Sequence, residues 1–256
     1  MDNFLLTYDV LEDDAFKEDK YFKNRLVLLV GQSYMNPADL IERVYSVNDI
    51  AFVAKIGTEI VGILLFNYRN RCTVVLENQR FSAIYNGYAV TDLRYRNQRI
   101  IQKLIAFATA EFNRRIEQTN TQLLLYAITS NPYALRAYRN VCEYMEPFSD
   151  GSFSVQGSQL VTRLKKELGI TVFEDAHPFK FTTSLPQRYS DFEQVNLDKA
   201  PEAEKLFLQR LGVIETMGDR VIFFWGPQDL LSTSSTRKSS GEPYHLFPFG
   251  ASDRTD

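Results

Sequence analysis

Residues 90–107 read VTDLRYRNQRIIQKLIAF, and this stretch decides how the rest of the chain is interpreted. A β-rich run passes through a short basic turn, with Arg94, Arg96 and Arg99, into an amphipathic segment that continues to Glu117. Apolar side chains recur there at the spacing of one helical face: Ile100, Ile101, Leu104, Ile105, Ala108, Phe112 and Ile116. The first N–H groups of a helix lack internal partners and carry the positive end of its dipole, so this junction predicts a phosphate-binding site.

The composition is that of an ordinary globular protein. Of 256 residues, 45% are hydrophobic and 24% are charged, so the chain can bury a core in one large domain or two small ones. The net charge of −3 and the isoelectric point of about 5.6 argue against a nucleic-acid binder, because such proteins bind by neutralising phosphates. The basic residues from Arg94 to Arg115 suit a small phosphate ligand instead.

The two cysteines, Cys72 and Cys142, and the two histidines are scattered without the spacing of a metal site. We therefore expect no metal and two reduced thiols. The first ten residues carry Asp2 and Asp9 and no long apolar run, so they do not predict a secretion signal. No stretch approaches the ~18 apolar residues that span a bilayer. The expectation is a cytoplasmic protein that does not bind membranes.

The first part of the chain predicts a strand, two helical regions and a hairpin. Residues 4–10 suit a strand, and apolar residues between 16 and 29 recur at helical spacing. Asn36-Pro37 suits a helix start, because Asn is a good N-cap and Pro fits the first helical position. Two β-rich runs within residues 50–68 flank a Gly57 turn, which predicts a hairpin.

The stretch quoted first predicts a strand-helix-strand unit. A strand over residues 82–91 precedes the long helix, and residues 121–128 follow it with an unbroken apolar run, which is typical of a strand buried on both faces. Such a unit crosses over right-handedly and places its strands side by side. Ser130-Asn131-Pro132 then predicts the start of a helix that runs through Tyr138. The result is an α/β or α+β sheet with helices on both faces.

The later part of the chain carries weaker signals. Residues 156–168 predict a helix that ends at Gly169, and residues 172–183 have strand character. Another helix is expected to start at Asp198, and residues 219–225 predict a strong strand. From Leu231 onward the low hydrophobicity favours a flexible tail.

Three stretches resemble the GNAT superfamily of N-acyltransferases. Glu59-Ile-Val-Gly62, in the hairpin, is similar to the family's second and third strands. Val90 to Ile105 resembles the family's Arg/Gln-x-x-Gly-x-Gly/Ala pattern between a strand and a helix. Asn131 to Tyr138 resembles the family's Asn-x-x-Ala-x-x-x-Tyr pattern on the helix after the fifth strand. Together these stretches cover about residues 50–145 in the family's order.

The resemblance implies a GNAT-like α/β fold, with a mixed, splayed central sheet flanked by helices and a C-terminal extension. It implies three parts. Residues 1–145 would form an acyl-CoA-binding core, residues 146–226 would complete the sheet and the acceptor side, and residues 227–256 would form a flexible tail.

The resemblance also implies an N-acetyltransferase, in which an amine attacks the thioester of acetyl-CoA, the acyl donor, directly. The residues implied to bind acetyl-CoA are Val90, Arg96, Asn97, Gln98, Arg99, Ile100, Ile101 and Asn131. Tyr138 would be the acid for the leaving thiolate, and it lies about two helical turns from Asn131. Asp92, near the end of the preceding strand, is the candidate base. The acceptor would be a small-molecule or peptide amine.

Each of these residues also has a plainer interpretation. Asn131 suits the N-cap of a helix, and Tyr138 suits a half-buried core aromatic. Arg96 and Arg99 suit solvated arginines at a helix start, and Asp92 suits the cap of a turn.

Two further functions remain open. At Arg99 and Ile101 the family has small residues, which let the backbone approach a pyrophosphate closely. This difference favours a GNAT-fold protein with lost or altered CoA chemistry that acts as a binding or regulatory module. A phosphate-binding α/β domain of another class would show fully parallel strands around the long helix, with no splay. His177 and His245 accompany no Ser or Cys motif, so neither is predicted to be catalytic. The sequence does not decide between a monomer and a homodimer.

Overall fold

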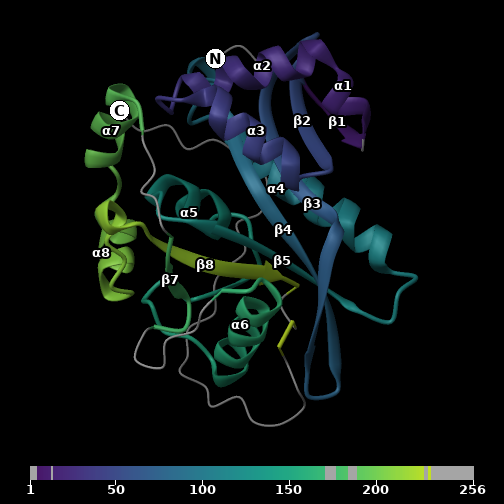
Figure 1. Cartoon of the computed structure of the whole chain (residues 1–256), viewed down its shortest axis with the longest axis vertical. Coiled ribbons are helices and arrows are strands. Elements are labelled where there is room, and N and C mark those ends of the chain that lie inside the picture. Colours follow the sequence, from purple (N-terminus) through teal and green to yellow (C-terminus); the bar gives the residue numbers. More distant parts are fainter. Residues whose placement is uncertain (1–4, 13, 171–176, 184–188, 228–229, 232–256) are drawn as a thin grey trace, which may run out of the picture.

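The computed structural model describes residues 5–12, 14–170, 177–183, 189–227 and 230–231 (Figure 1). Along the chain, its strands, α-helices and short 3₁₀ turns (η) are β1 (Leu6–Glu12), α1 (Asp14–Glu18), α2 (Lys20–Gly31), α3 (Pro37–Val47), β2 (Ile50–Ile56), β3 (Glu59–Leu76), β4 (Gln79–Thr91), η1 (Leu93–Tyr95), α4 (Ile100–Ile116), β5 (Gln122–Thr129), α5 (Pro132–Arg139), β6 (Tyr144–Glu146), α6 (Val155–Glu167), β7 (Lys180–Thr182), α7 (Asp191–Asp198), α8 (Glu202–Arg210), η2 (Glu215–Met217) and β8 (Asp219–Gly226).

One mixed sheet joins the strands of the described chain in the order β1-β2-β3-β4-β5-β8-β6, with β7 also paired to β8. All of these neighbours are antiparallel except β4 and β5, which are parallel and flank the crossover helix α4. This architecture confirms the predicted mixed α/β sheet with helices around it. β8 lies between β5 and β6, so strands from before and after residue 145 of the chain belong to the same sheet.

Helices cover the two faces of the sheet with separate hydrophobic cores. α2 and α3 bury Phe22, Leu26 and Ile41 against alternate residues of β2 and β3. The intervening residues of the same strands face α4, whose Phe112 ring lies 5.0 Å from that of Phe66. Figure 1 shows α2 and α3 as a layer at the top of the molecule, with α5 and α6 lower down. Successive side chains of a strand point to opposite faces of the sheet. The continuous hydrophobic runs of β2 and β3 therefore supply apolar residues to both cores.

The N-terminus of α4 sits very close to β3, and Gly62 permits this approach. A Cβ atom on Gly62 would lie 2.5 Å from Cγ2 of Ile100 and 3.2 Å from Cδ1 of Leu104. Ile100 and Leu104 are the first buried residues of the apolar helix face predicted from the sequence. The glycine therefore determines how closely the start of α4 packs against the sheet.

The C-terminal part differs in detail from the sequence-based expectation. The helix expected from Asp198 is α8, which begins at Glu202 after Pro201, and α7, which Ser190 caps, was not predicted. Of the predicted strand 172–183, residues 180–182 form β7, while residues 171–176 lie outside the described part. The predicted tail also lies outside it, apart from residues 227, 230 and 231.

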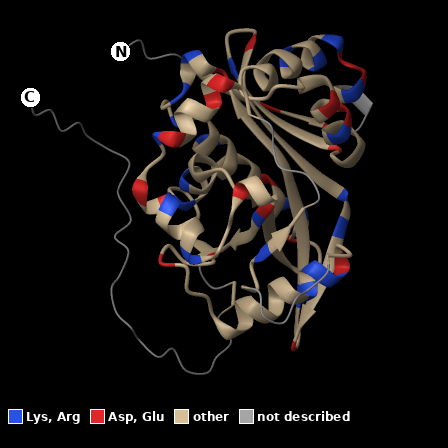
Figure 2. Ribbon diagram, turned by 60° about the vertical axis from the view of Figure 1, so that its left-hand side comes forward, with Lys and Arg blue, Asp and Glu red and all other residues tan. Residues whose placement is uncertain are grey.

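Charge is spread over the described chain. Figure 2 shows acidic and basic residues intermingled along the ribbon. Within the described ranges, no helix combines the length and hydropathy that a membrane crossing requires. In the same ranges, no three His, Cys, Asp or Glu side chains are grouped closely enough to hold a metal ion.

Candidate active site

β4 and β5 separate from each other halfway along β4. Their parallel pairing ends at Asn86 and Ala127, although β4 continues to Thr91. At the same level the β3–β4 register shifts, so that Leu65 faces Tyr88, Phe66 faces Asn86, and Gly87 is an extra residue. Such a bulge bends a strand and increases its twist. The predicted splay of the sheet therefore begins at Gly87.

Gly87 is required at this bulge because a buried side chain lies on it. A Cβ atom there would be 2.3 Å from Oδ1 of Asn48, which follows α3 and is almost fully buried. Nδ2 of Asn48 donates to the carbonyl oxygen of Val44 at 2.8 Å, which holds this side chain in place. The contact between α3 and β4 thus fixes the position of the bend.

The part of β4 beyond the bulge offers backbone groups toward the opening. The Asp92 N–H donates to the Val61 carbonyl at 2.9 Å, so residues 90 and 92 point their backbone groups at β3. The groups of Ala89 and Thr91 then point away from β3, and neither residue pairs with β5. Val90, the strand residue predicted to contact a cofactor, bonds to β3, and its two neighbours face the opening.

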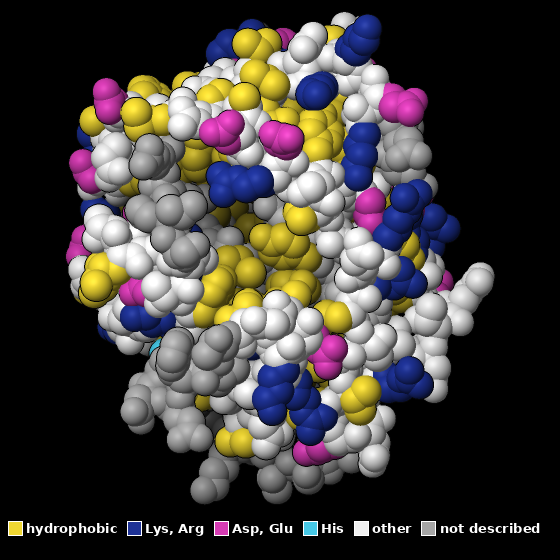
Figure 3. All heavy atoms as spheres, in the orientation of Figure 1, with side chains coloured by type: hydrophobic (Ala, Val, Ile, Leu, Met, Phe, Trp, Pro, Cys, Tyr) yellow, Lys and Arg dark blue, Asp and Glu magenta, His cyan; other side chains and the backbone are white. Residues whose placement is uncertain are grey.

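The opening is visible as a hollow on the molecular surface. Figure 3 shows the hollow with hydrophobic side chains on its floor, in the region where Figure 1 places the space between β4 and α5. A surface hollow with an apolar floor is typical of sites that bind small molecules. The hollow lies beside the bulge, at the point where the two central strands diverge.

Tyr138 lies close to the point where β4 and β5 separate. Its hydroxyl donates to Oδ1 of Asn86, the last β4 residue paired with β5, and Nδ2 of Asn86 donates to the Leu65 carbonyl at 2.9 Å. The Tyr138 ring packs against Phe223 and Trp225 of β8. The side chain is 2% exposed, and burial raises the pKa of its hydroxyl, which therefore keeps its proton. The side chain is fully buried rather than half-buried as the plain interpretation expects, and its catalytic role stays a prediction. The sequence did not identify Asn86 as its partner.

The loop between β4 and α4 presents a set of free N–H groups. Asn97 and Arg99 adopt left-handed backbone conformations, with φ of 68° and 58°. Alternation of left- and right-handed residues turns successive N–H groups toward one point, an arrangement that binds anions. Across the described ranges, no acceptor is found for the N–H groups of Asn97, Arg99, Ile100, Ile101 and Gln102. The prediction of a phosphate site named the amides of residues 97–101, and of these the Gln98 N–H donates to the Tyr95 carbonyl at 3.4 Å.

The side chains of this loop have different roles. Arg96 is engaged within the protein, since its Nη2 lies 2.8 Å from Oε2 of Glu193 and 2.9 Å from Oγ of Ser33. Arg99 and Gln98 are exposed, whereas Ile100 is buried and Ile101 is partly buried against the core. Arg96 thus connects α7 to the loop after α2, and Arg99 is the arginine of the loop that extends into solvent.

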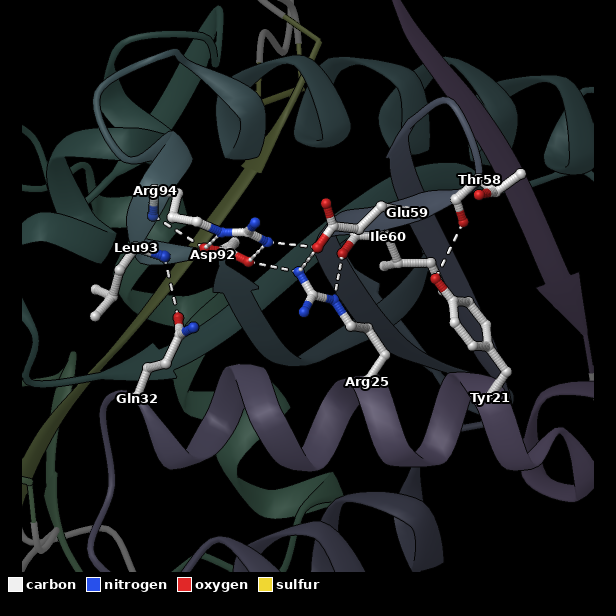
Figure 4. A network of polar contacts seen from close by, with 9 residues as sticks. All are labelled: Tyr21, Arg25, Gln32, Thr58, Glu59, Ile60, Asp92, Leu93 and Arg94. Carbon is white, nitrogen blue, oxygen red and sulfur yellow. Dashed lines mark hydrogen bonds and ion pairs between the residues drawn. The ribbon is translucent and has the colours of Figure 1, made fainter.

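Asp92 is the centre of an ionic network that joins α2 to the β4–α4 junction (Figure 4). Its Oδ2 lies 2.5 Å from Nη2 of Arg25 and 2.7 Å from Nη2 of Arg94, and its Oδ1 accepts from the Arg94 N–H at 2.9 Å. Glu59 accepts from both arginines. Burial raises the pKa of Asp92, but the hydrogen bonds from Arg94 and Arg25 outweigh it and lower the pKa to about 2. So weakly basic a carboxylate suits the predicted cap and is poorly suited to the predicted base.

Asn131 caps α5. Its Oδ1 accepts from the N–H groups of Tyr133 at 2.9 Å and Ala134 at 3.2 Å, as the plain interpretation of Asn131-Pro132 predicts. Its Nδ2 has no acceptor among the described residues, so it can still donate to a ligand. His177 packs its ring against Phe153, and His245 lies outside the described residues.

A second group of polar and aromatic side chains lies at the same end of the sheet. Tyr34 follows α2, Tyr88 follows the bulge and Tyr189 precedes α7; the Tyr34 ring lies 6.0 Å from that of Tyr88 and 5.2 Å from that of Tyr189. Glu215 and Arg220 carry charge beside them. Sequence reasoning missed this group, because its members are far apart in the chain and belong to no motif.

No protein-family model and no curated protein matches this sequence. Solved structures of similar fold include an aminoglycoside acetyltransferase, meta-AAC0020, from an uncultured soil metagenomic sample (20% identity, TM-score 0.36, 55% of this chain and 88% of that chain). They also include an IAA acetyltransferase from Bacillus cereus ATCC 14579 (14%, 0.37, 56% and 79%). A third is the GNAT family acetyltransferase SP0256 from Streptococcus pneumoniae TIGR4 (17%, 0.34, 53% and 85%). At these TM-scores, the chain's own strand order and contacts must carry any functional conclusion.

Proposed function

We propose that this protein is an N-acetyltransferase that uses acetyl-CoA as acyl donor and an amine as acceptor. The observation that carries the proposal is the continuous path from the open edge of β4 to the free amides at the start of α4. An extended arm that ends in a pyrophosphate needs both features: strand-like hydrogen bonds along its length and a cluster of N–H groups at its charged end.

The residues fit the donor as follows. The N–H groups of Asn97 and of residues 99–102 would bind the pyrophosphate at the positive end of the α4 dipole. The backbone groups of Ala89 and Thr91 would bond the pantetheine arm, and Nδ2 of Asn131 would donate to it from the other side of the opening. Arg99 would bind through its N–H group, and its side chain is exposed next to the amides.

Acetyl-CoA would supply an activated acyl group and a thiolate leaving group. In the transfer, the C–N bond forms as the C–S bond breaks, the amine loses a proton, and the sulfur gains a proton or a hydrogen bond. Tyr138 would serve the sulfur, because its buried hydroxyl is a donor close to the point where β4 and β5 separate. It would turn from Asn86 to the sulfur as negative charge develops there. The base for the amine stays unassigned in this proposal.

A non-catalytic binding module is the second candidate. Three observations favour it: the Tyr138 hydroxyl already has a partner in Asn86, Arg96 is already paired with Glu193, and the Ile101 side chain lies in the first turn of α4, where close approach of a phosphate needs room. The two candidates share the fold and differ in turnover.

Acetyl-CoA titration followed by thiol release separates them. The enzyme proposal expects acetyl-CoA at high micromolar concentration to bind and raise the melting temperature, and it expects free thiol to appear when amines are added. Tyr138→Phe should retain binding and lower turnover by about 10²-fold. Tyr133→Phe is the matched control, since it removes a hydroxyl that bonds the Asn196 carbonyl on the exposed side of the same helix.

Two results would count against the proposal. If acetyl-CoA does not bind, both the proposed donor site and the proposed enzyme activity are refuted. Binding without thiol release for any amine leaves the binding module, and equal turnover of Tyr138→Phe and wild type removes Tyr138 from the mechanism.

A further inference from the structure

Arg220, near the start of β8, carries a buried positive charge for which the described residues supply no ion-pair partner. The residue is 5% exposed, and its Nη1 donates to the carbonyl oxygen of Asp219 at 2.7 Å. No carboxylate of the described chain forms an ion pair with it; the neighbouring Asp219 carboxylate pairs with Lys180 instead. Burying a guanidinium without an anionic partner is costly, so a charge held in this way is suited to an incoming anion.

Glu215 carries the opposite charge nearby. Its Oε1 accepts from Oγ of Ser130 at 3.2 Å. Burial raises the pKa of Glu215, while Ser130, the positive charge of Arg220 and Tyr189 oppose this rise. Arg220 and Glu215 thus influence each other electrostatically without forming an ion pair in the described structure. The nearby carboxylate of Glu193 is already paired with Arg96.

Three tyrosine rings surround these charges. The charge of Arg220 acts on the hydroxyls of Tyr34 and Tyr189, and Tyr88 packs against Tyr34 from β4. Burial raises the pKa of Tyr34 to about 12, so it stays neutral. Two separated charges of opposite sign therefore lie among neutral aromatic rings.

The group lies where an acceptor amine would have to be. Val221 pairs with Thr129 across β5 and β8, which places Arg220 level with Ser130, and Ser130 immediately precedes the α5 cap Asn131. Tyr88 is the first β4 residue after the bulge. The charges and rings thus border the opening between the strands from the side of β8.

We propose that this site binds a free α-amino acid as the acceptor, with its ammonium toward Glu215, its carboxylate toward Arg220 and its side chain among Tyr34, Tyr88 and Tyr189. The assignment of the amino acid as acceptor rests on the proposed acetyltransferase function. A zwitterion neutralises the buried charge of Arg220 and the partly exposed charge of Glu215 at once. A simple amine would leave Arg220 unpaired, and a carboxylate without an amine would leave Glu215 unpaired.

The test uses the full-length protein without acetyl-CoA and measures binding by calorimetry. The common L-amino acids are screened at millimolar concentration, and the best of them is compared with its methyl ester and with the amine that lacks the carboxylate. We expect both analogues to bind at least about tenfold more weakly, because a buried charged partner is lost. In Arg220→Gln, the amino acid and its ester should bind equally, and in Glu215→Gln the affinity for the ammonium should fall.

Controls keep the test decisive. Arg80→Gln removes an exposed arginine on the distant part of β4 and should leave the affinity unchanged. If Arg220→Gln fails to fold, the comparison of acid, ester and amine on the wild-type protein still decides. The proposal is overturned if no amino acid binds, or if the ester or the amine binds as tightly as the acid.

The two proposals fail separately. If an amino acid binds but acetyl-CoA does not, the acetyltransferase proposal is refuted and the zwitterion site is supported. Acetyl-CoA binding and acetylation of amines that lack a carboxylate, at the same rate as amino acids, removes the zwitterion site and leaves the enzyme.

Discussion

Replacing Asp92 by Asn is expected to destabilise the fold in a way that depends on pH. The carboxylate is fully buried and holds Arg25 and Arg94 at the junction of α2, β3 and α4 (Figure 4). Its pKa is about 2 in the folded protein against a model value of 3.8. At about 1.4 kcal/mol per pKa unit, the charged carboxylate contributes roughly 2 kcal/mol to the free energy of unfolding.

The sign of the pH dependence follows from the lowered pKa. The unfolded chain binds a proton on Asp92 at a higher pH than the folded protein does. The stabilisation is therefore complete above pH 3.8 and is lost as the pH falls through about 2. Asp92→Asn has no such carboxylate, so its deficit relative to wild type should be about 2 kcal/mol at neutral pH and should shrink below pH 4.

Urea denaturation of wild type and Asp92→Asn across this pH range measures the difference. Asp9→Asn is the control, because Asp9 pairs with Lys55 across β1 and β2 at the surface and should contribute at most about 1 kcal/mol. The reasoning is refuted if the Asp92→Asn deficit is no larger than that of Asp9→Asn, or if it stays constant as the pH falls.

The same variant addresses the base predicted from the sequence. A carboxylate with a pKa of about 2 is ionised but binds protons weakly at neutral pH. Any loss of turnover in Asp92→Asn should therefore follow its loss of stability and should be recovered at lower temperature. A folded variant that binds acetyl-CoA normally but shows no turnover would restore Asp92 as the base.

Three other changes have clear expected outcomes. Gly87→Ala should lower the free energy of unfolding by about 1–3 kcal/mol in urea, because its Cβ meets the Asn48 side chain, and Asn48→Ala in the same protein should recover part of the loss. Arg99→Gly should raise stability by about 0.5–1 kcal/mol, because glycine adopts φ of 58° without strain, and calorimetry should show tighter acetyl-CoA binding; weaker binding would show that the Arg99 side chain contacts phosphate. Burial lowers the pKa of Lys165 to about 8, so wild-type stability should rise with pH between about 8 and 10, and Lys165→Met should lose that rise.

The position of the opening illustrates why tertiary contacts matter for function. The bulge at Gly87, the cap Asn131 and the hydrogen bond from Tyr138 to Asn86 meet only because β4 and β5 pair up to Asn86 and no further. A change of register in this pair would move the aromatic rings away from the free amides. The site therefore depends on the sheet as much as on the loop.

The sequence by itself determined the central elements of the fold. The 3.6-residue period of α4, the hydrophobic runs of β2, β3 and β5 and the Asn131-Pro132 cap are local or periodic signals, and all appear in the structure as elements of the predicted type. The free amides at the start of α4 also follow from the sequence, since any helix leaves its first N–H groups unpaired.

Only the tertiary structure decided how the charged residues are used. Arg96 and Asp92 read as ligand and base from their positions in the loop, but Glu193 and Arg25, which lie far away in the chain, engage them. Arg220 and Glu215 gave no signal in the sequence, because burial and distance between charges are properties of the packed chain. Whether a charge is free, paired or buried depends on which distant segments pack against it, and no local pattern records that.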